Sequence, residues 1–409
     1  MTVLSTYNEF SGRHWDTGTI CNVLAYQGIA APHTGQPFSE ALLLGISGGI
    51  TAMYLVFEYQ GFEPQVTLGT RYPFEPMERI WERLRLNPDV RETTSETRAV
   101  DNLRAALAAD RPAIVWADLC SMPYNTLHIF DENFWVIMPL VVYGYDEGID
   151  IVSLADRAQV PLHASTAQLA TARGRTQKNQ YKLVTLAPLA APTAETVAQA
   201  VRAGIRDGVA LFLDGPPKGP PRNFGQAALQ TWADMLTDTK SVKRWSKVFA
   251  TGSELYAGLT AAYGSIESWE TGGAASRSQY ADFLDEARVL LDLPALSDIA
   301  QQFRQSAQQW RDLAAALLPA SVPPLHVTRT LLTHKDRLFG ERGAQALDEI
   351  RQVDERLDQI RGEVAQQFPL SAAEVATLRE ELRERVLAIR ATEQAAMEAL
   401  RVTQAITEG

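Results

Sequence analysis

The chain has 409 residues and a mass of 45.1 kDa, which is enough for more than one domain of ordinary size. Its 46% hydrophobic and 21% charged residues are typical of globular proteins and exclude a disordered or collagen-like chain. A formal net charge of −11 disfavours general binding to nucleic acid, because phosphates carry the same sign.

Two cysteines cannot form a disulfide framework or a cysteine-based zinc site, so we expect a reducing, cytoplasmic setting. The first residues lack the apolar core of a signal peptide. No apolar run reaches the length of about 18 residues that a membrane span needs. We therefore expect a protein that neither crosses a membrane nor is exported.

The N-terminal half mixes helix and strand patterns. Helical patterns occur at residues 17–28 and 39–44, and the glycines of residues 45–49 are expected to end the second helix in a tight turn rather than to bind phosphate. Short β-branched runs predict strands at residues 113–117, 139–143 and 149–154. The last two flank the turn composition of residues 144–148, which predicts a hairpin. We therefore predict that the N-terminal half is an α+β domain with a central antiparallel sheet.

The pattern changes near Ala191 and Pro192, after which almost every segment has helical spacing. The proline-rich and glycine-rich stretch at residues 214–221 is an expected loop. We therefore predict a first domain over residues 1–190 and an all-helical domain over residues 191–409.

The C-terminal part contains two amphipathic stripes. The first comprises Leu347, Ile350, Val353, Leu357, Ile360, Val364 and Phe368, and the second comprises Val375, Leu378, Leu382, Val386 and Ile389. Pro369 should end the first helix, and Ser371 with Glu374 has the pattern of a capping box. We expect a long antiparallel helical hairpin that packs on its own chain or on a second subunit, forming a homo-oligomer, rather than on a membrane.

The common motifs of nucleotide binding, zinc proteolysis, disulfide exchange and serine hydrolysis are missing from the sequence. We expect no cofactor and no bound metal. His128, with Asp131 and Glu132 close behind, has the residue types of a metal or acid–base cluster, but a solvated loop is the preferred interpretation.

Several separated segments carry a family resemblance. They are residues 12–28, 38–49, 123–124, 141–146, 155–157 and 172–173, followed by Gly272, Gly273, Arg277, Tyr280, Phe283, Leu284, Glu286 and Ala287. In these residues the chain resembles the family of butirosin biosynthesis protein H, in which a papain-like cysteine acyltransferase domain precedes a helical domain. The resemblance implies a papain-like fold for residues 1–190. It also implies transfer of an aminoacyl group from a carrier-protein thioester to an amine of a small metabolite.

The resemblance also implies where a catalytic triad would lie. Its cysteine position is Trp15, its histidine position is most nearly Met138, and its orienting acid is Asp156. An indole is not a nucleophile and a thioether is not a base, and losing a triad member typically costs a factor of about 10⁴–10⁶ in rate. We therefore expect a pseudoenzyme in which Asp156 is the retained third member.

The two cysteines of the chain are the candidates to replace the missing nucleophile. Cys21 lies six residues after Trp15, about 240° around a helix, and should be a core residue. Cys120 follows a predicted strand in a loop that could reach the cleft. His14, Asp16, Thr17, Tyr124, Arg157 and Cys120 are the expected substrate-binding residues.

The sequence is compatible with three functions. The first is binding of an acyl or amine metabolite, an acyl carrier protein or an active sister enzyme without thiol catalysis. The second is an active acyltransferase or amide hydrolase that uses a relocated nucleophile or direct aminolysis, with Asp156, His14 or His128 as the base. The third is an architectural role through the C-terminal helices.

Overall fold

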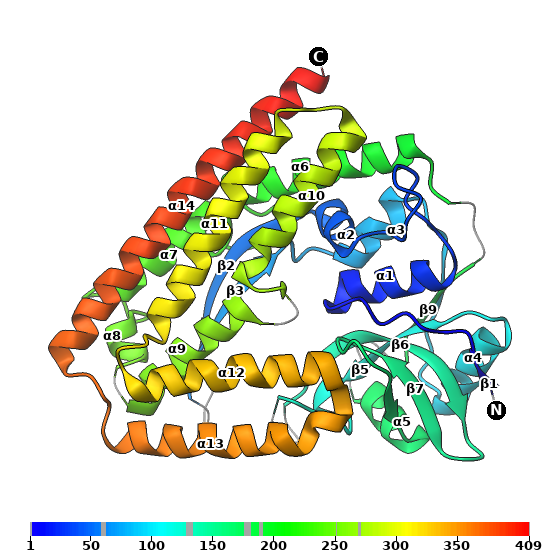
Figure 1. The fold of residues 1–409 in the computed structure, drawn as a ribbon, viewed down its shortest axis with the longest axis horizontal. Coiled ribbons are helices and arrows are strands. Elements are labelled where there is room, and N and C mark those ends of the chain that lie inside the picture. The colour runs from blue at the N-terminus through cyan, green and yellow to red at the C-terminus, as the bar shows by residue number, and fades with distance from the viewer. Residues whose placement is uncertain are drawn as a thin grey trace. The chain divides into compact units, whose positions relative to one another are not determined.

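A computed structural model describes residues 2–58, 63–127, 134–175, 181–187, 191–250, 252–268 and 271–408, and for residues 404–408 the backbone alone. The chain divides into two units, each assembled from separate segments (Figure 1). The first unit comprises Met1–Leu43, Met77–Val197 and Arg337–Gln352, and the second comprises Leu44–Pro76, Ala198–Asp336 and Val353–Gly409. The domain boundary at residue 191 stays a prediction.

The first unit is built on a seven-stranded sheet with the order β4-β9-β5-β6-β7-β8, in which β1 also pairs with β6. Every neighbouring pair is antiparallel. The strands are β1 (Thr2–Val3), β4 (Pro88–Arg91), β5 (Ala113–Asp118), β6 (Ile137–Asp146), β7 (Ile151–Ala155), β8 (Leu162–Ala164) and β9 (Leu183–Leu186). The α+β class and the central antiparallel sheet are thus confirmed.

The β6–β7 hairpin is confirmed, but its turn is shorter than predicted. Gly144 and Asp146 belong to β6, so the predicted turn at residues 144–148 begins too early. A Cβ on Gly144 would lie 3.0 Å from Ser153 and 3.1 Å from Val3. The glycine is therefore needed for close approach of neighbouring strands and not for chain reversal.

Helices complete the first unit around this sheet. They are α1 (Trp15–Tyr26), α4 (Glu96–Ala108) and α5 (Thr166–Gly174). Helix α1 packs on β6, and α5 packs on β5. Residues from Thr17 to Leu24 are buried almost all round α1, which is why this helix lacks a clear apolar stripe in the sequence.

The second unit consists of helices and one strand pair. The strands are β2 (Ile50–Phe57) and β3 (Gln65–Arg71), which pair antiparallel and contact α7 and α9. The helices include α7 (Gly225–Thr237), α8 (Trp245–Val248), α9 (Gly252–Glu267), α10 (Arg277–Leu291), α11 (Leu296–Leu317) and α14 (Ala372–Glu408). From residue 194 onward the described elements are all helical, as predicted.

Five further helices each contain residues that belong to both units. They are α2 (Glu40–Ser47), α3 (Pro76–Arg83), α6 (Ala194–Leu213), α12 (Pro323–Arg342) and α13 (Leu347–Gln366), and in α3 only the first residue belongs to the second unit. Gly48 and Gly49 have φ values of 123° and 73°, which confirms the predicted turn after α2. A Cβ on Gly204 would lie 2.0 Å from the Gly45 carbonyl oxygen. The glycines therefore permit close backbone packing.

The predicted C-terminal hairpin is wrong, although both of its stripes are correct. Ile350, Val353, Ile360 and Val364 of α13 are buried, as are Val375, Leu378, Leu382, Val386 and Ile389 of α14. The capping box also forms, because Ser371 N donates to Glu374 Oε2 at 2.8 Å. However, α14 packs along α7 and α11 (Figure 1), while Asp354 of α13 binds Lys335 of α12. An apolar stripe predicts burial but does not identify the partner helix.

A buried ion pair lies at the centre of the second unit. Arg277 and Glu393 have side chains that are 0% exposed, and Arg277 Nε donates to Glu393 Oε1 at 2.7 Å. The guanidinium also donates to the carbonyl oxygens of Thr51 at 2.8 Å and Thr70 at 3.1 Å. Glu393 accepts further hydrogen bonds, including one from Trp310 Nε1 at 2.8 Å. The pair therefore joins β2, β3, α10, α11 and α14.

None of the described helices combines the length and apolar character that a bilayer span requires.

Candidate functional site

The N-terminus of α1 is fixed by side chains on either side of Trp15, its first residue. His14 is the N-cap, and its Nδ1 accepts a hydrogen bond from Asp16 N at 3.2 Å. The Asp16 carboxylate lies 3.9 Å from the same ring nitrogen. His14 thus has a local backbone role, and its predicted contact with a substrate stays a prediction.

Glu40 provides a second support for the start of α1. Its carboxylate accepts hydrogen bonds from Arg13 N and His14 N, each at 2.9 Å, and from Thr17 Oγ1 at 2.8 Å. A carboxylate is favourable at this end of a helix because the unpaired N–H groups carry partial positive charge. The sequence identified Glu40 only as part of the next helix.

Trp15 stacks on a buried arginine. The Arg157 guanidinium carbon lies 5.1 Å from the centroid of the Trp15 ring and 5.1 Å from that of Phe339. Arg157 Nε also donates to Asp156 Oδ1 at 3.3 Å, and the two side chains are 7% and 1% exposed. A cation between two aromatic faces is attracted by the partial negative charge on the face of each neutral ring. Trp15 and the Asp156–Arg157 pair therefore form one packed cluster.

Tyr124 joins this cluster from the segment after β5. Its side chain is buried and stacks on Phe339, with ring centroids 6.3 Å apart. Burial, and next to it the negative charge of Asp156, raises the pKa of Tyr124 well above its ordinary value, so the hydroxyl keeps its proton. The Tyr124 hydroxyl lies next to the Asp156 carboxylate, and the two side chains interact by a hydrogen bond. These buried polar groups therefore lie side by side in the cluster.

Four residues predicted from the sequence thus come together with one that was missed. We call Trp15, Tyr124, Asp156, Arg157 and Phe339 the Trp15 cluster. Phe339 lies on α12, far along the chain, and no motif in the sequence points to it. Only its buried contacts with Arg157 and Tyr124 in the structure identify it as a member of the cluster.

Met138 lies near the start of β6, where it pairs with Ala117 of β5. Its thioether is half-buried and cannot accept a proton at neutral pH. The alignment of Met138 with the family histidine stays a prediction.

Cys21 is a buried core residue, as predicted. Its thiol donates a hydrogen bond to the Phe38 carbonyl oxygen at 3.0 Å, and its side chain is 6% exposed. Burial, with the negative charge of Glu40, raises the pKa of Cys21 to about 12. The thiol is therefore protonated at neutral pH and unsuited to nucleophilic attack.

We expect Cys21 to resist alkylation in the folded protein. Since its pKa is raised to about 12, its thiolate fraction at pH 8 is about a thousandfold below that of an ordinary thiol. Peptide mapping after iodoacetamide treatment measures this directly. In guanidinium chloride, both cysteines should be labelled at equal rates, and rapid labelling of native Cys21 at pH 8 would contradict the assignment.

Cys120 belongs to a different group of side chains. Asp118 Oδ1 accepts hydrogen bonds from Cys120 N at 3.2 Å and from Val136 N at 2.9 Å, and its Oδ2 lies 3.8 Å from Arg175 Nε. Burial and the charge of Asp118 raise the pKa of the half-buried Cys120 thiol. Cys120 as a substrate-binding residue stays a prediction.

His128, Asp131 and Glu132 lie outside the described residues. Among the described residues, no three histidine, cysteine or carboxylate side chains are grouped so that they could hold a metal ion.

Two family models match successive stretches of the chain. Residues 14–157, which include all members of the Trp15 cluster except Phe339, match the model of the N-terminal domain of butirosin biosynthesis protein H. Residues 167–330 match a domain of unknown function, DUF4872. No curated protein matches the chain. The chain therefore carries a butirosin biosynthesis protein H N-terminal domain followed by a DUF4872 domain.

Proposed function

We propose that this protein is an acyltransferase homologue of specialised metabolism that binds an acyl or aminoacyl metabolite, its carrier protein or a sister enzyme without thiol catalysis. The observation that carries the proposal is the position of Trp15. Its indole occupies the first turn of α1, where the resemblance places the nucleophilic cysteine, and it stacks on Arg157. The one thiol on this helix, Cys21, is protonated and buried.

The chemistry of the Trp15 cluster suits recognition. An aromatic face favours an apolar acyl chain, and the adjacent Tyr124 hydroxyl and Asp156 carboxylate are the polar groups of the cluster. A few placed polar groups in an apolar wall are the usual composition of a small-molecule site.

The second candidate is acyl transfer by direct attack of an amine on a thioester. The buried carboxylate of Asp156 favours it, because a carboxylate could accept the proton that the amine loses. Backbone N–H groups at the start of α1 would then face the developing oxyanion. This reaction needs no acyl-enzyme.

The two candidates are separated by incubating the protein with an acyl-thioester carrier and an amine, followed by intact mass spectrometry. We expect no mass increase of the protein and no acylated amine, together with saturable binding of the carrier or acyl thioester. Formation of acylated amine that is lost in Asp156→Asn would establish the second candidate. A covalently acylated protein would overturn both.

A further inference from the structure

A cavity lies in the first unit, at the other end of α1 from Trp15. It has a volume of about 460 Å³, within the usual range for small-molecule sites. Its lining includes Thr6, Glu9, Tyr26, Gln27, Asp110 and Arg111. Because α1 has 12 residues, the cavity is about 18 Å from the Trp15 cluster along the helix axis. It is therefore separate from the site considered above.

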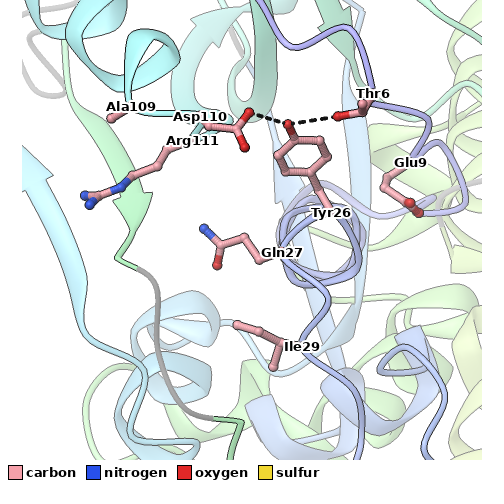
Figure 2. A pocket seen from close by; sticks show the side chains of 8 residues that line it. All are labelled: Thr6, Glu9, Tyr26, Gln27, Ile29, Ala109, Asp110 and Arg111. Atoms are coloured by element: carbon pink, nitrogen blue, oxygen red, sulfur yellow. Dashed lines mark hydrogen bonds between the residues drawn. The ribbon is translucent and has the colours of Figure 1, made fainter.

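Polar and charged side chains line this cavity. Figure 2 shows Gln27, Asp110 and Arg111 around the same open space. In the described part of the chain, Gln27 Oε1 and Arg111 Nε have no hydrogen-bond partner, but both atoms are buried. Asp110 is exposed and Arg111 is half-buried, so these two residues can contact a ligand in the cavity.

The position of Asp110 is fixed by its neighbours. Tyr26 Oη donates a hydrogen bond to Asp110 Oδ1 at 2.7 Å, drawn as a dashed line in Figure 2. Asp110 also has a φ of 59°, a left-handed conformation that aspartate and asparagine tolerate better than most residues. The second carboxylate oxygen has no protein hydrogen bond among the described residues and is available to a ligand.

Two helix C-termini give this cavity a preference for a cation. Gln27 is the C-cap of α1 and Ala109 is the C-cap of α4, and both residues line the cavity. Neither helix has a basic residue in its last turn to offset the negative end of its dipole. Glu9 and Asp110 add two carboxylates against the single guanidinium of Arg111.

We propose that this cavity binds a small zwitterionic amino acid. Its ammonium group binds the Asp110 carboxylate, where the helix dipoles also favour positive charge. Its carboxylate binds the Arg111 guanidinium, which matches a carboxylate with paired N–H donors. An amine without a carboxylate leaves Arg111 unpaired, and a carboxylic acid without an amine is repelled by Asp110.

The test uses the full-length protein and titration by ligand-observed NMR. The probes are glycine, β-alanine and 5-aminopentanoate, which differ in the spacing of ammonium and carboxylate, with ethylamine and propionate as single-charge controls. We expect saturable binding of at least one amino acid, weaker binding of ethylamine and none of propionate.

Three variants assign the contacts. Asp110→Asn keeps the left-handed backbone and the acceptor for Tyr26, yet should weaken amino acid and ethylamine binding at least about tenfold. Arg111→Gln should weaken amino acid binding by a similar factor and leave ethylamine unchanged. Glu82→Gln, an exposed position on α3, removes the same charge as Asp110→Asn and should change nothing.

Far-UV circular dichroism of each variant confirms that it is folded. Absence of saturable binding for all three amino acids, binding of propionate equal to theirs, or unchanged affinity in Asp110→Asn would each overturn the proposal. None of these results depends on whether the Trp15 cluster binds an acyl thioester.

Discussion

Replacing Arg277 by methionine is expected to lower the free energy of unfolding of the second unit by about 3–5 kcal/mol, because the change leaves the Glu393 carboxylate buried without its cation. The lost hydrogen bonds to the carbonyl oxygens of Thr51 and Thr70 add to this cost. Urea unfolding followed by tryptophan fluorescence measures the effect, since Trp310 donates a hydrogen bond to Glu393.

The control for this experiment is Arg304→Met. Arg304 pairs with Asp282 and Asp285 at the surface, and its side chain is 40% exposed. Exposed pairs contribute at most about 1 kcal/mol, so this variant should unfold almost as the parent does. The double variant Arg277→Met with Glu393→Leu should recover part of the loss because no unpaired charge remains. Equal unfolding curves for Arg277→Met and Arg304→Met would contradict the buried ion pair.

Replacing Trp15 by cysteine is expected to give a thiol that acyl thioesters modify, whereas the parent protein remains unmodified. The new thiol would lie in the first turn of α1, where the N–H groups and the nearby Arg157 guanidinium lower a thiol pKa. The carboxylates of Asp16 and Glu40 act in the opposite direction. Intact mass spectrometry after incubation with an acyl-thioester carrier detects the adduct.

The matched control is Ala25→Cys, which places a half-buried thiol at the other end of the same helix. There the dipole raises the thiol pKa, so alkylation by iodoacetamide at pH 7 should be at least about tenfold slower than in Trp15→Cys. Adding Arg157→Met to Trp15→Cys should slow its alkylation by removing the nearby cation. Equal rates at both ends of α1 would show that this helix terminus does not activate a thiol.

Local patterns in the sequence predicted α1, β5, β6 and β7 of the first unit, but not its other strands or α4 and α5. The β-branched runs around Val115 and Val141 lie in neighbouring antiparallel strands, since alternating or apolar short runs favour sheet. The strand pair β2–β3 was not predicted, and neither was its place with the helices, because that grouping depends on contacts between distant segments.

The sequence predicted four of the five residues of the Trp15 cluster. The resemblance placed Trp15, Tyr124, Asp156 and Arg157 close together, and the structure joins them through stacking and an ion pair. Phe339 could not be predicted, because the sequence around a phenylalanine on a helix does not indicate which distant arginine its ring will contact. The hydrogen bond between Asp156 and Tyr124 could not be predicted either, because it depends on how distant segments pack.

The Arg277–Glu393 pair has a consequence for protein synthesis. The ribosome releases β2, β3 and α10 long before α14, so the nascent second unit holds a guanidinium whose carboxylate has not yet been made. Burying that guanidinium alone is unfavourable, which delays consolidation of this core until Glu393 emerges. A nonsense mutation upstream of Glu393 would therefore leave a product that chaperones and proteases recognise.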